Sequence, residues 1–232
     1  FNITSNNVTL DCKEYTITYA NSSTGYAVKN FGSNSSIVKN CYIQQGYINR
    51  TVSFAVYFLN SSNSSILNNT IVTLGSASTG STTSNRGIMF VASNFSTIAN
   101  NRINSTGRDG HAVLLSRSSN ANVSSNIIRT QNRFTYGVYS LDSLYQTIFS
   151  NNITTLEQSS YGIRITISTG KADYNNLTSN LINTSGSRGY PVYLYKTNNN
   201  TLAGNIIQTN STLTEGIYLV GSSGNNISSN NI

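Results

Sequence analysis

Aliphatic residues recur along the chain in one register that repeats about every 25 residues. Eight anchor positions define this register: Val38, Ile66, Ile98, Val123, Ile148, Leu177, Leu202 and Ile227. Five places after each anchor stands an isoleucine, from Ile43 to Ile232 without exception. Such self-similarity is typical of stacked architectures, in which each repeat buries its apolar residues against the next copy.

Each repeat is predicted to consist of short strands. Its apolar residues alternate at two-residue spacing and are β-branched or aromatic, as in GIMFV, PVYLY and GIYLV, with Gly, Asn and Ser between them. No stretch sustains helical periodicity, and parallel crossovers are overwhelmingly right-handed. We therefore predict an all-β, single-stranded, right-handed parallel β-helix of about nine coils. Residues 1–232 are expected to form one domain of a longer chain, because solenoid ends need caps and this chain ends within a coil.

An asparagine occupies one position of the repeat almost throughout. Three places after the anchors stand Cys41 and then Asn69, Asn101, Asn126, Asn151, Asn180, Asn205 and Asn230. In stacked coils each amide lies above its next copy, so it donates a hydrogen bond to one neighbour and accepts one from the other. Asparagine also tolerates the left-handed backbone of a sharp corner. We expect a structural asparagine ladder beside a column of stacked isoleucines.

Few charges accompany this pattern, and most of them are basic. Charged residues make up 9% of the chain, and the formal net charge is +7. Several of the basic residues concentrate in the third to fifth coils: Arg102, Arg108, Arg117, Arg129 and Arg133. They suit an acidic glycan or an anionic cell surface, or they are dispersed charges that keep the coil soluble. We expect neither nucleic-acid binding nor a membrane span, since no motif for the first and no long apolar window for the second occurs.

The phrases NNVTLDCKEYTI, SSIVKNCYI and SSILNNTI resemble the right-handed parallel β-helix repeat family. That family includes NosD-like proteins and the carbohydrate-binding and sugar-hydrolase type of secreted solenoids. The resemblance covers essentially the whole chain and implies the fold. It leaves the function open, because the family includes lyases, glycosidases, epimerases, adhesins and non-catalytic surface proteins. The NosD name is linked to copper, but with one His (His111), one Met (Met89) and no metal-ligand spacing we expect no metal site and no cofactor.

Two cysteines, Cys12 and Cys41, lie 29 residues apart, which is about one coil. Stacking brings the Cα atoms of such a pair to about 5 Å, within the range of a disulfide. A disulfide suits the extracellular character of the composition. The alternative is that Cys41 replaces the ladder asparagine as a small buried residue.

Catalysis on polysaccharides needs paired carboxylates, or a carboxylate–metal cluster with a basic residue nearby. Among the seven acids, Asp142 and Asp173 form the one credible cluster, with Arg164 and Lys171 nearby. We favour the alternative that they are solvated turn residues. The turn GRDGH (residues 107–111) offers an Asp and a His without a partnered nucleophile. We therefore assign no catalytic residue.

Tyrosines form the most distinctive surface feature. An outward column about nine places before the anchors reads Tyr57, Met89, Leu114, Tyr139, Arg164, Tyr193 and Tyr218, with Tyr195 one step across. Outward positions are usually polar, so this stripe indicates a surface for sugar rings or for a protein partner. The alternative is a ladder that stiffens the sheet, or a face covered by the longer connections at 44–54, 72–86 and 168–176.

Asn-x-Ser/Thr sequons are abundant and fall mostly outside the ladder. We expect glycosylation, in a host that modifies exported proteins, at a subset of Asn34, Asn60, Asn94, Asn104, Asn122, Asn176, Asn183, Asn210 and Asn226. The alternative is that turns rich in Asn, Ser and Thr generate sequons by chance.

These patterns predict a non-catalytic β-helix, secreted or at the cell surface, that serves attachment or surface assembly. Its expected partners are glycans or cell-surface proteins, and the coil ends and the tyrosine-rich face also allow self-association. The alternative is a polysaccharide-active enzyme, a lyase or a glycoside hydrolase, that uses Asp142, Asp173, Arg164 and Lys171.

Overall fold

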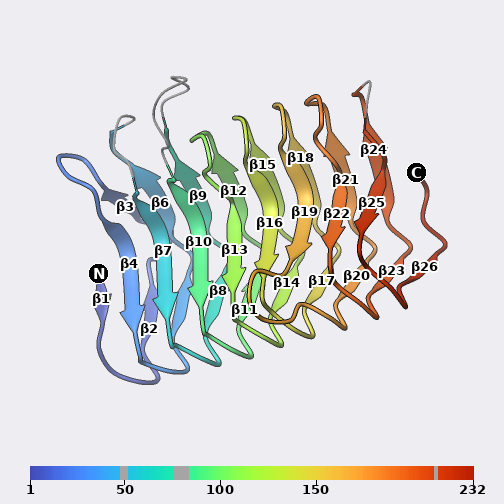
Figure 1. The fold of residues 1–232 in the computed structure, drawn as a ribbon. Coiled ribbons are helices and arrows are strands. Elements are labelled where there is room, and N and C mark those ends of the chain that lie inside the picture. Colours follow the sequence, from blue (N-terminus) through green and yellow to red (C-terminus); the bar gives the residue numbers. More distant parts are fainter. Residues whose placement is uncertain (48–51, 76–83, 212–213) are drawn as a thin grey trace.

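The computed structural model of the chain describes residues 1–47, 52–75, 84–211 and 214–232. In these residues 26 short strands form three parallel sheets (Figure 1). Sheet A contains β1 (Asn2–Ile3), β4 (Tyr26–Phe31), β7 (Phe54–Leu59), β10 (Arg86–Val91), β13 (Val113–Ser116), β16 (Tyr136–Leu141), β19 (Tyr161–Thr166), β22 (Val192–Tyr195) and β25 (Ile217–Val220). Sheet B contains β2 (Thr9–Asp11), β5 (Ile37–Lys39), β8 (Ser65–Leu67), β11 (Thr97–Ala99), β14 (Asn122–Ser124), β17 (Thr147–Phe149), β20 (Asn176–Thr178), β23 (Thr201–Ala203) and β26 (Asn226–Ser228). Sheet C contains β3 (Thr16–Tyr19), β6 (Tyr42–Gln45), β9 (Thr70–Thr73), β12 (Arg102–Ser105), β15 (Ile127–Thr130), β18 (Asn152–Thr155), β21 (Leu181–Thr184) and β24 (Ile206–Thr209).

Each coil contributes one strand to each sheet in turn, and each strand pairs in parallel with the strand one coil away. The anchors pair with one another from coil to coil, as Ile98 does with Val123 and Ile148 with Leu177. This is the right-handed parallel β-helix that the sequence predicts, with nine strands in sheets A and B and eight in sheet C. The described residues include no helix long and apolar enough to cross a membrane.

The core consists of aliphatic columns that run along the stack. The isoleucines five places after the anchors, from Ile43 to Ile207, are at most 2% exposed. Burial of one such side chain contributes about 1.5–3 kcal/mol. Sheet A can approach sheet C closely because the second residue of most of its longer strands is small, as Gly87, Gly137 and Gly162 are. At Gly137, for example, an added Cβ would lie 2.4 Å from Cγ2 of Ile153.

The predicted asparagine ladder runs along the corner between sheets B and C. The expectation that its asparagines adopt the left-handed backbone of the corner is wrong, because the residue before each takes that conformation, as Asn100 and Ser125 do with φ of 57° and 54°. Nδ2 of Asn101 donates to Oδ1 of Asn126, and Nδ2 of Asn126 donates to Oδ1 of Asn151, both at 3.0 Å. The same Oδ1 of Asn126 accepts the backbone N–H of Asn101 at 2.9 Å, and Nδ2 of Asn101 also reaches the carbonyl of Ile66 at 2.8 Å. Each buried amide in the ladder therefore bonds to both neighbouring coils, which avoids the cost of unsatisfied polar groups.

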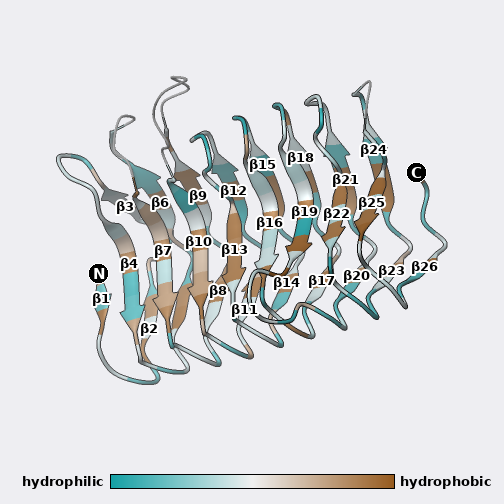
Figure 2. Cartoon of the chain, viewed as in Figure 1, coloured by the Kyte–Doolittle hydropathy of each residue, from teal (hydrophilic) through white to brown (hydrophobic). Residues whose placement is uncertain are grey.

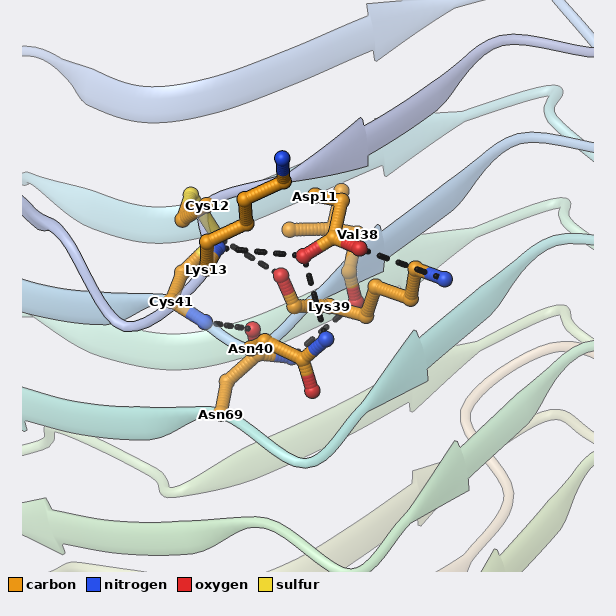
Figure 3. Close-up of polar contacts among 8 residues, drawn as sticks. All are labelled: Asp11, Cys12, Lys13, Val38, Lys39, Asn40, Cys41 and Asn69. Atoms are coloured by element: carbon orange, nitrogen blue, oxygen red, sulfur yellow. Dashed lines mark hydrogen bonds and ion pairs between the residues drawn. A yellow bond between two sulfur atoms is a disulfide. The ribbon is translucent and has the colours of Figure 1, made fainter.

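A disulfide joins the first two coils beside the start of this ladder (Figure 3). Cys12 and Cys41 are bonded, and their Cα atoms lie 4.8 Å apart. Cys41 also stands in the ladder register, because its backbone N–H donates to Oδ1 of Asn69 at 2.9 Å. The cysteine at this position thus combines a covalent link with the backbone contact of a ladder residue.

An exposed acid lies next to the disulfide. Oδ1 of Asp11 accepts from Nδ2 of Asn40 at 3.0 Å, and Oδ2 lies 3.4 Å from Nζ of Lys39 (Figure 3). These contacts lower the pKa of Asp11, the hydrogen bond from Asn40 most strongly. Exposed pairs of this kind contribute little to stability because water screens them.

The turns carry further coil-to-coil contacts. Hydrophobic residues concentrate in the strands, whereas the turns are largely hydrophilic or neutral (Figure 2). Between sheets A and B, Nδ2 of Asn175 donates to Asn200 at 2.9 Å, and the backbone N–H of Ser61 donates to Oγ of Ser93 at 3.0 Å. The sequence analysis did not predict these polar columns. Of the longer connections that it did predict, residues 48–51 and 76–83 lie outside the described residues.

Candidate functional site

The outer face of sheet A carries two adjacent columns of large side chains, which we call the aromatic face. Ring contacts between the columns place them on the same face, as the ring centroids of Tyr136 and Tyr139 lie 5.2 Å apart and those of Phe54 and Tyr57 lie 5.5 Å apart. The first column reads Tyr26, Phe54, Arg86, His111, Tyr136, Tyr161 and Tyr190. The second column reads Tyr57, Met89, Leu114, Tyr139, Arg164, Tyr193 and Tyr218. The structure therefore brings the tyrosines singled out from the sequence onto one face.

Arg164 lies among tyrosine rings in the C-terminal half of the aromatic face. Its Cζ lies 4.9 Å from the ring centroid of Tyr136, 5.2 Å from that of Tyr139, and 5.5 Å from those of Tyr161 and Tyr193. Its guanidinium also donates a hydrogen bond to the hydroxyl of Tyr136. Within the described residues Arg164 forms no ion pair. Aromatic rings, rather than a carboxylate, therefore stabilise its charge, by about 0.5–2 kcal/mol per favourable contact.

The tyrosines of this half stack on one another along the solenoid. The ring centroids of Tyr136 and Tyr161 lie 5.0 Å apart, and those of Tyr161 and Tyr193 lie 5.2 Å apart, with interplanar angles of 4° and 19°. Tyr190 and Tyr218 stack at 4.7 Å. The result is a row of offset rings with hydroxyl groups, a combination that offers a sugar both apolar contact and hydrogen bonds.

A second aromatic patch covers the N-terminal half of the same face. Tyr57 lies 5.3 to 5.5 Å, between ring centroids, from Tyr26, Phe31 and Phe54. Tyr195 lies beside the C-terminal patch, with its ring parallel to that of Tyr193 at 6.4 Å. The aromatic face therefore extends over most of the coils.

Arg86 and His111 lie between the two patches. Cζ of Arg86 lies 5.3 Å from the ring centroid of Phe54, and its Nη1 lies 3.2 Å from Sδ of Met89. The imidazole of His111 stacks on Tyr136 at 4.4 Å with an interplanar angle of 8°, and only 7% of His111 is exposed. The middle of the face thus holds buried nitrogen groups among apolar and aromatic neighbours.

Burial and the arginines control titration on this face. Burial, helped by the charges of Arg86 and Arg164, lowers the pKa of His111 well below its ordinary value, so the imidazole is neutral at pH 7. Burial raises the pKa of Tyr136 to about 12, although Arg164 opposes this shift. The phenol groups therefore remain protonated donors at neutral pH.

The turn GRDGH supplies His111 and lies at the edge of the aromatic face. Its Asp109 has a left-handed backbone with φ of 53° and lies 3.8 Å from Nε of Arg108. Burial raises the pKa of Asp109, and Arg108 and Arg86 oppose that shift. Asp109 is therefore the carboxylate next to the basic middle of the face.

The acids considered for catalysis have carboxylates bonded to backbone groups. Oδ1 of Asp142 accepts hydrogen bonds from three successive backbone N–H groups of the connection 168–176, at 2.7 to 3.3 Å. Oδ1 of Asp173 accepts one from the next coil at 2.7 Å. Arg164 lies among the tyrosines and Lys171 is exposed, and within the described residues no ion pair joins these bases to either acid. This geometry favours the role of turn residues.

A shallow groove lies on the outer face of sheet C. It has a volume of about 470 Å³, and Arg102, Asn104, Ile127, Arg129 and Gln131 are among its lining residues. No carboxylate belongs to the described residues that line it. Two of the clustered arginines thus face this groove, which lacks a carboxylate pair for glycosidic chemistry.

Exposure divides the predicted glycosylation sites into two groups. The exposed ones are Asn34, Asn60, Asn176, Asn210 and Asn226, and the partly exposed ones are Asn94, Asn104, Asn122 and Asn183. A glycan needs an accessible side-chain nitrogen, so the first group is better placed for modification.

The first column of the aromatic face was not predicted from the sequence. Its signal is the position immediately before the small residue of the sheet A strands, which holds an aromatic ring in several coils, as in Tyr136-Gly137 and Tyr161-Gly162. The small residue marks the strand in the sequence, but the residue before it varies. His111, considered only as part of a turn, belongs to this column.

Three parallel sheets wound into a single stack define a parallel β-helix protein. The family model described as "Periplasmic copper-binding protein (NosD)" matches residues 2–191. The chain belongs to this NosD family, to which its repeat phrases point. No curated protein sequence matches the chain.

Solved structures of the same fold include DFA-IIIase from Arthrobacter chlorophenolicus A6. A mutant of that protein gives a TM-score of 0.62 at 16% identity, over 89% of this chain and 47% of that one. The structure of its complex with DFA-III gives a TM-score of 0.58 at 12% identity, over 88% of this chain and 57% of that one. The structure of its complex with GF2 gives a TM-score of 0.56 at 13% identity, over 86% of this chain and 56% of that one. The chain thus spans about half the length of these proteins. At these identities the likeness concerns the fold alone.

The copper in the family description can be tested against the donors of this chain. Copper sites use His nitrogen, Cys thiolate and Met sulfur. The chain has one His, one Met and two Cys, and both cysteines form the disulfide. His111 is buried between two arginine charges, which disfavour a nearby cation, and the described residues contain no cluster of three metal-binding side chains. These residues do not fit a copper centre.

Proposed function

We propose that this chain is a non-catalytic β-helix of the cell envelope or cell surface that binds glycans on the aromatic face. The observation that carries the proposal is the row of stacked tyrosines around Arg164, from Tyr136 to Tyr218, on the outside of one sheet. A sugar ring placed on such a row buries its apolar C–H face against the rings, and its hydroxyls bond to the phenol groups. Outer sheet faces of soluble proteins are usually polar, so a continuous aromatic surface favours a ligand.

The comparisons supply two supporting points. The family description names a periplasmic protein, which favours a location outside the cytoplasm. DFA-IIIase, which shares the fold, has structures in complex with GF2 and DFA-III. The family membership and the fold thus leave room for both binding and catalysis. Attachment to cell-surface proteins, self-association through the aromatic face or the coil ends, and a single domain over residues 1–232 belong to the same proposal.

The alternative is a lyase or glycoside hydrolase, favoured by the position of Asp142 and Asp173 in adjacent turns of the stack. Against it stand the backbone hydrogen bonds that both carboxylates accept. A carboxylate oxygen engaged in this way holds a turn in place and is not free to exchange a proton with a substrate.

The test is a glycan-array screen run beside a reducing-sugar release assay on uronate and neutral polysaccharides. We expect binding without turnover. Turnover that Asp142→Asn or Asp173→Asn abolishes would establish the enzyme instead. A chain that binds no glycan on the array would contradict the proposed function.

A further inference from the structure

The middle of the aromatic face combines an excess of positive charge with buried nitrogen atoms that lack partners. Nδ1 of His111, Nε of Arg86 and Nε of Arg164 are buried and have no hydrogen-bond partner within the described residues. A buried polar atom that is left without a partner is destabilising. Three of them on one outer face indicate a site that a ligand completes.

The charges of this region are poorly balanced. His111 and Arg164 both contact the ring of Tyr136, at 4.4 and 4.9 Å, and Arg86 precedes Gly87, whose backbone N–H donates to the carbonyl of His111 at 3.1 Å. Asp109 is the acid that acts on Arg86, and it also pairs with Arg108 at 3.8 Å. Asp109 thus interacts with two guanidinium groups, those of Arg86 and Arg108, whereas Arg164 forms no ion pair within the described residues.

We propose that Arg86, His111 and Arg164 form an anion subsite of the aromatic face, which binds the carboxylate or sulfate group of an acidic glycan. This inference rests on the proposed function and names its ligand class. Guanidinium groups bind carboxylates and sulfates through paired N–H donors. The aromatic patches on either side, with Tyr57 and Tyr139 at their inner edges, hold the flanking sugar rings.

The geometry explains why this face carries arginines within an aromatic row. Rings alone bind neutral and acidic sugars alike, whereas a desolvated arginine discriminates between them. Arg164 is already fixed by four rings, so little side-chain freedom is lost when it binds an anion. The subsite is therefore preorganised.

The test compares the affinities of three trisaccharides by titration calorimetry. One is built of galacturonate units, one of galactose units and one of galactose 6-sulfate units. We expect the wild-type chain to bind one or both charged ligands about tenfold or more tightly than the neutral one. Arg86→Gln and Arg164→Gln should remove that preference, so that each variant binds the charged and the neutral ligands with affinities within about twofold of one another. The control Arg129→Gln makes the same charge change on the outer face of sheet C and should keep the preference. The two charged ligands distinguish a carboxylate from a sulfate as the preferred group.

His111 offers a readout that does not depend on any variant. It is the single histidine of the chain, so the NMR signal of its imidazole Cε1–H is assigned without further work. We expect this signal to shift with the charged ligands and not with galactose. Equal affinity for all three ligands, or loss of the preference in Arg129→Gln as well, would overturn the anion subsite and leave glycan binding intact. If none of the three trisaccharides binds and the glycan-array screen also finds no bound glycan, the proposed function itself is overturned.

Discussion

The guanidinium carbon of Arg164 lies 4.9 Å from the ring centroid of Tyr136, and the same guanidinium donates a hydrogen bond to the hydroxyl of that tyrosine. The contact joins two coils, since Arg164 follows Tyr136 by 28 residues. It makes the aromatic face a rigid surface, because ring and cation fix each other. A surface that is rigid before binding loses less entropy when it binds.

The asparagine ladder should dominate the stability of the stack. We expect Asn151→Ala to destabilise the chain by about 2–4 kcal/mol, because it removes several buried hydrogen bonds and leaves partners unsatisfied. Asn152 is the matched control, since it is the next residue and is exposed. Asn152→Ala should change stability by less than about 0.5 kcal/mol. Urea unfolding measures both, and equal effects would show that the ladder is not a main source of stability.

The disulfide between Cys12 and Cys41 should increase the free energy of unfolding while the two cysteines remain oxidised. Closing a 29-residue loop contributes up to about 3–4 kcal/mol through the entropy of the unfolded chain. We expect the free energy of unfolding of the double variant Cys12→Ser/Cys41→Ser to be lower by up to that amount. Thiol titration of the denatured, non-reduced protein should find no free thiol. Two free thiols would show that the cysteines are unpaired in solution.

His111 should make stability depend on pH just below neutrality. Its pKa is lowered by burial, Arg86 and Arg164, so the unfolded chain binds a proton that the folded chain does not. Stability is therefore lost as the pH falls below about 6.5, by at most about 1.4 kcal/mol per pH unit. We expect His111→Gln to flatten this slope between about pH 7 and 5.5. That range lies above the ordinary pKa of Asp109, whose own pKa is raised. Identical slopes in denaturant melts of the two proteins would contradict the buried neutral imidazole.

Exposure should decide which sequons carry glycans. In a host that glycosylates exported proteins, we expect occupancy mainly at Asn34, Asn60, Asn176, Asn210 and Asn226. Peptide mass spectrometry measures the occupancy of each site. An intact mass equal to the 25.1 kDa of the chain would show that the sequons arise from composition alone.

The columns that repeat in sequence were the ones that sequence could predict. The isoleucines, the anchors and the asparagine ladder share one spacing, and identical residues stack on identical residues. The first aromatic column was missed because its members differ from coil to coil, from Phe54 to Arg86 to His111. Their common feature is position rather than residue type. Likewise, the aromatic corner residues Tyr145 and Tyr174 have left-handed backbones, with φ of 57° and 60°, where an asparagine or glycine is the ordinary choice.

The most direct test of the account is the affinity of the aromatic face for a glycan selected on the array. We compare the wild-type chain with the triple variant Tyr139→Ser/Tyr193→Ser/Tyr218→Ser. The control is Tyr42→Ser/Tyr145→Ser/Tyr174→Ser, which removes three exposed tyrosines from other surfaces. The account predicts that the first variant keeps its fold and binds about tenfold or more weakly, because stacking surface is lost, whereas the control binds like the wild type. Unchanged affinity in the first variant would contradict glycan binding on this face and leave the tyrosines as a column that only stiffens the sheet.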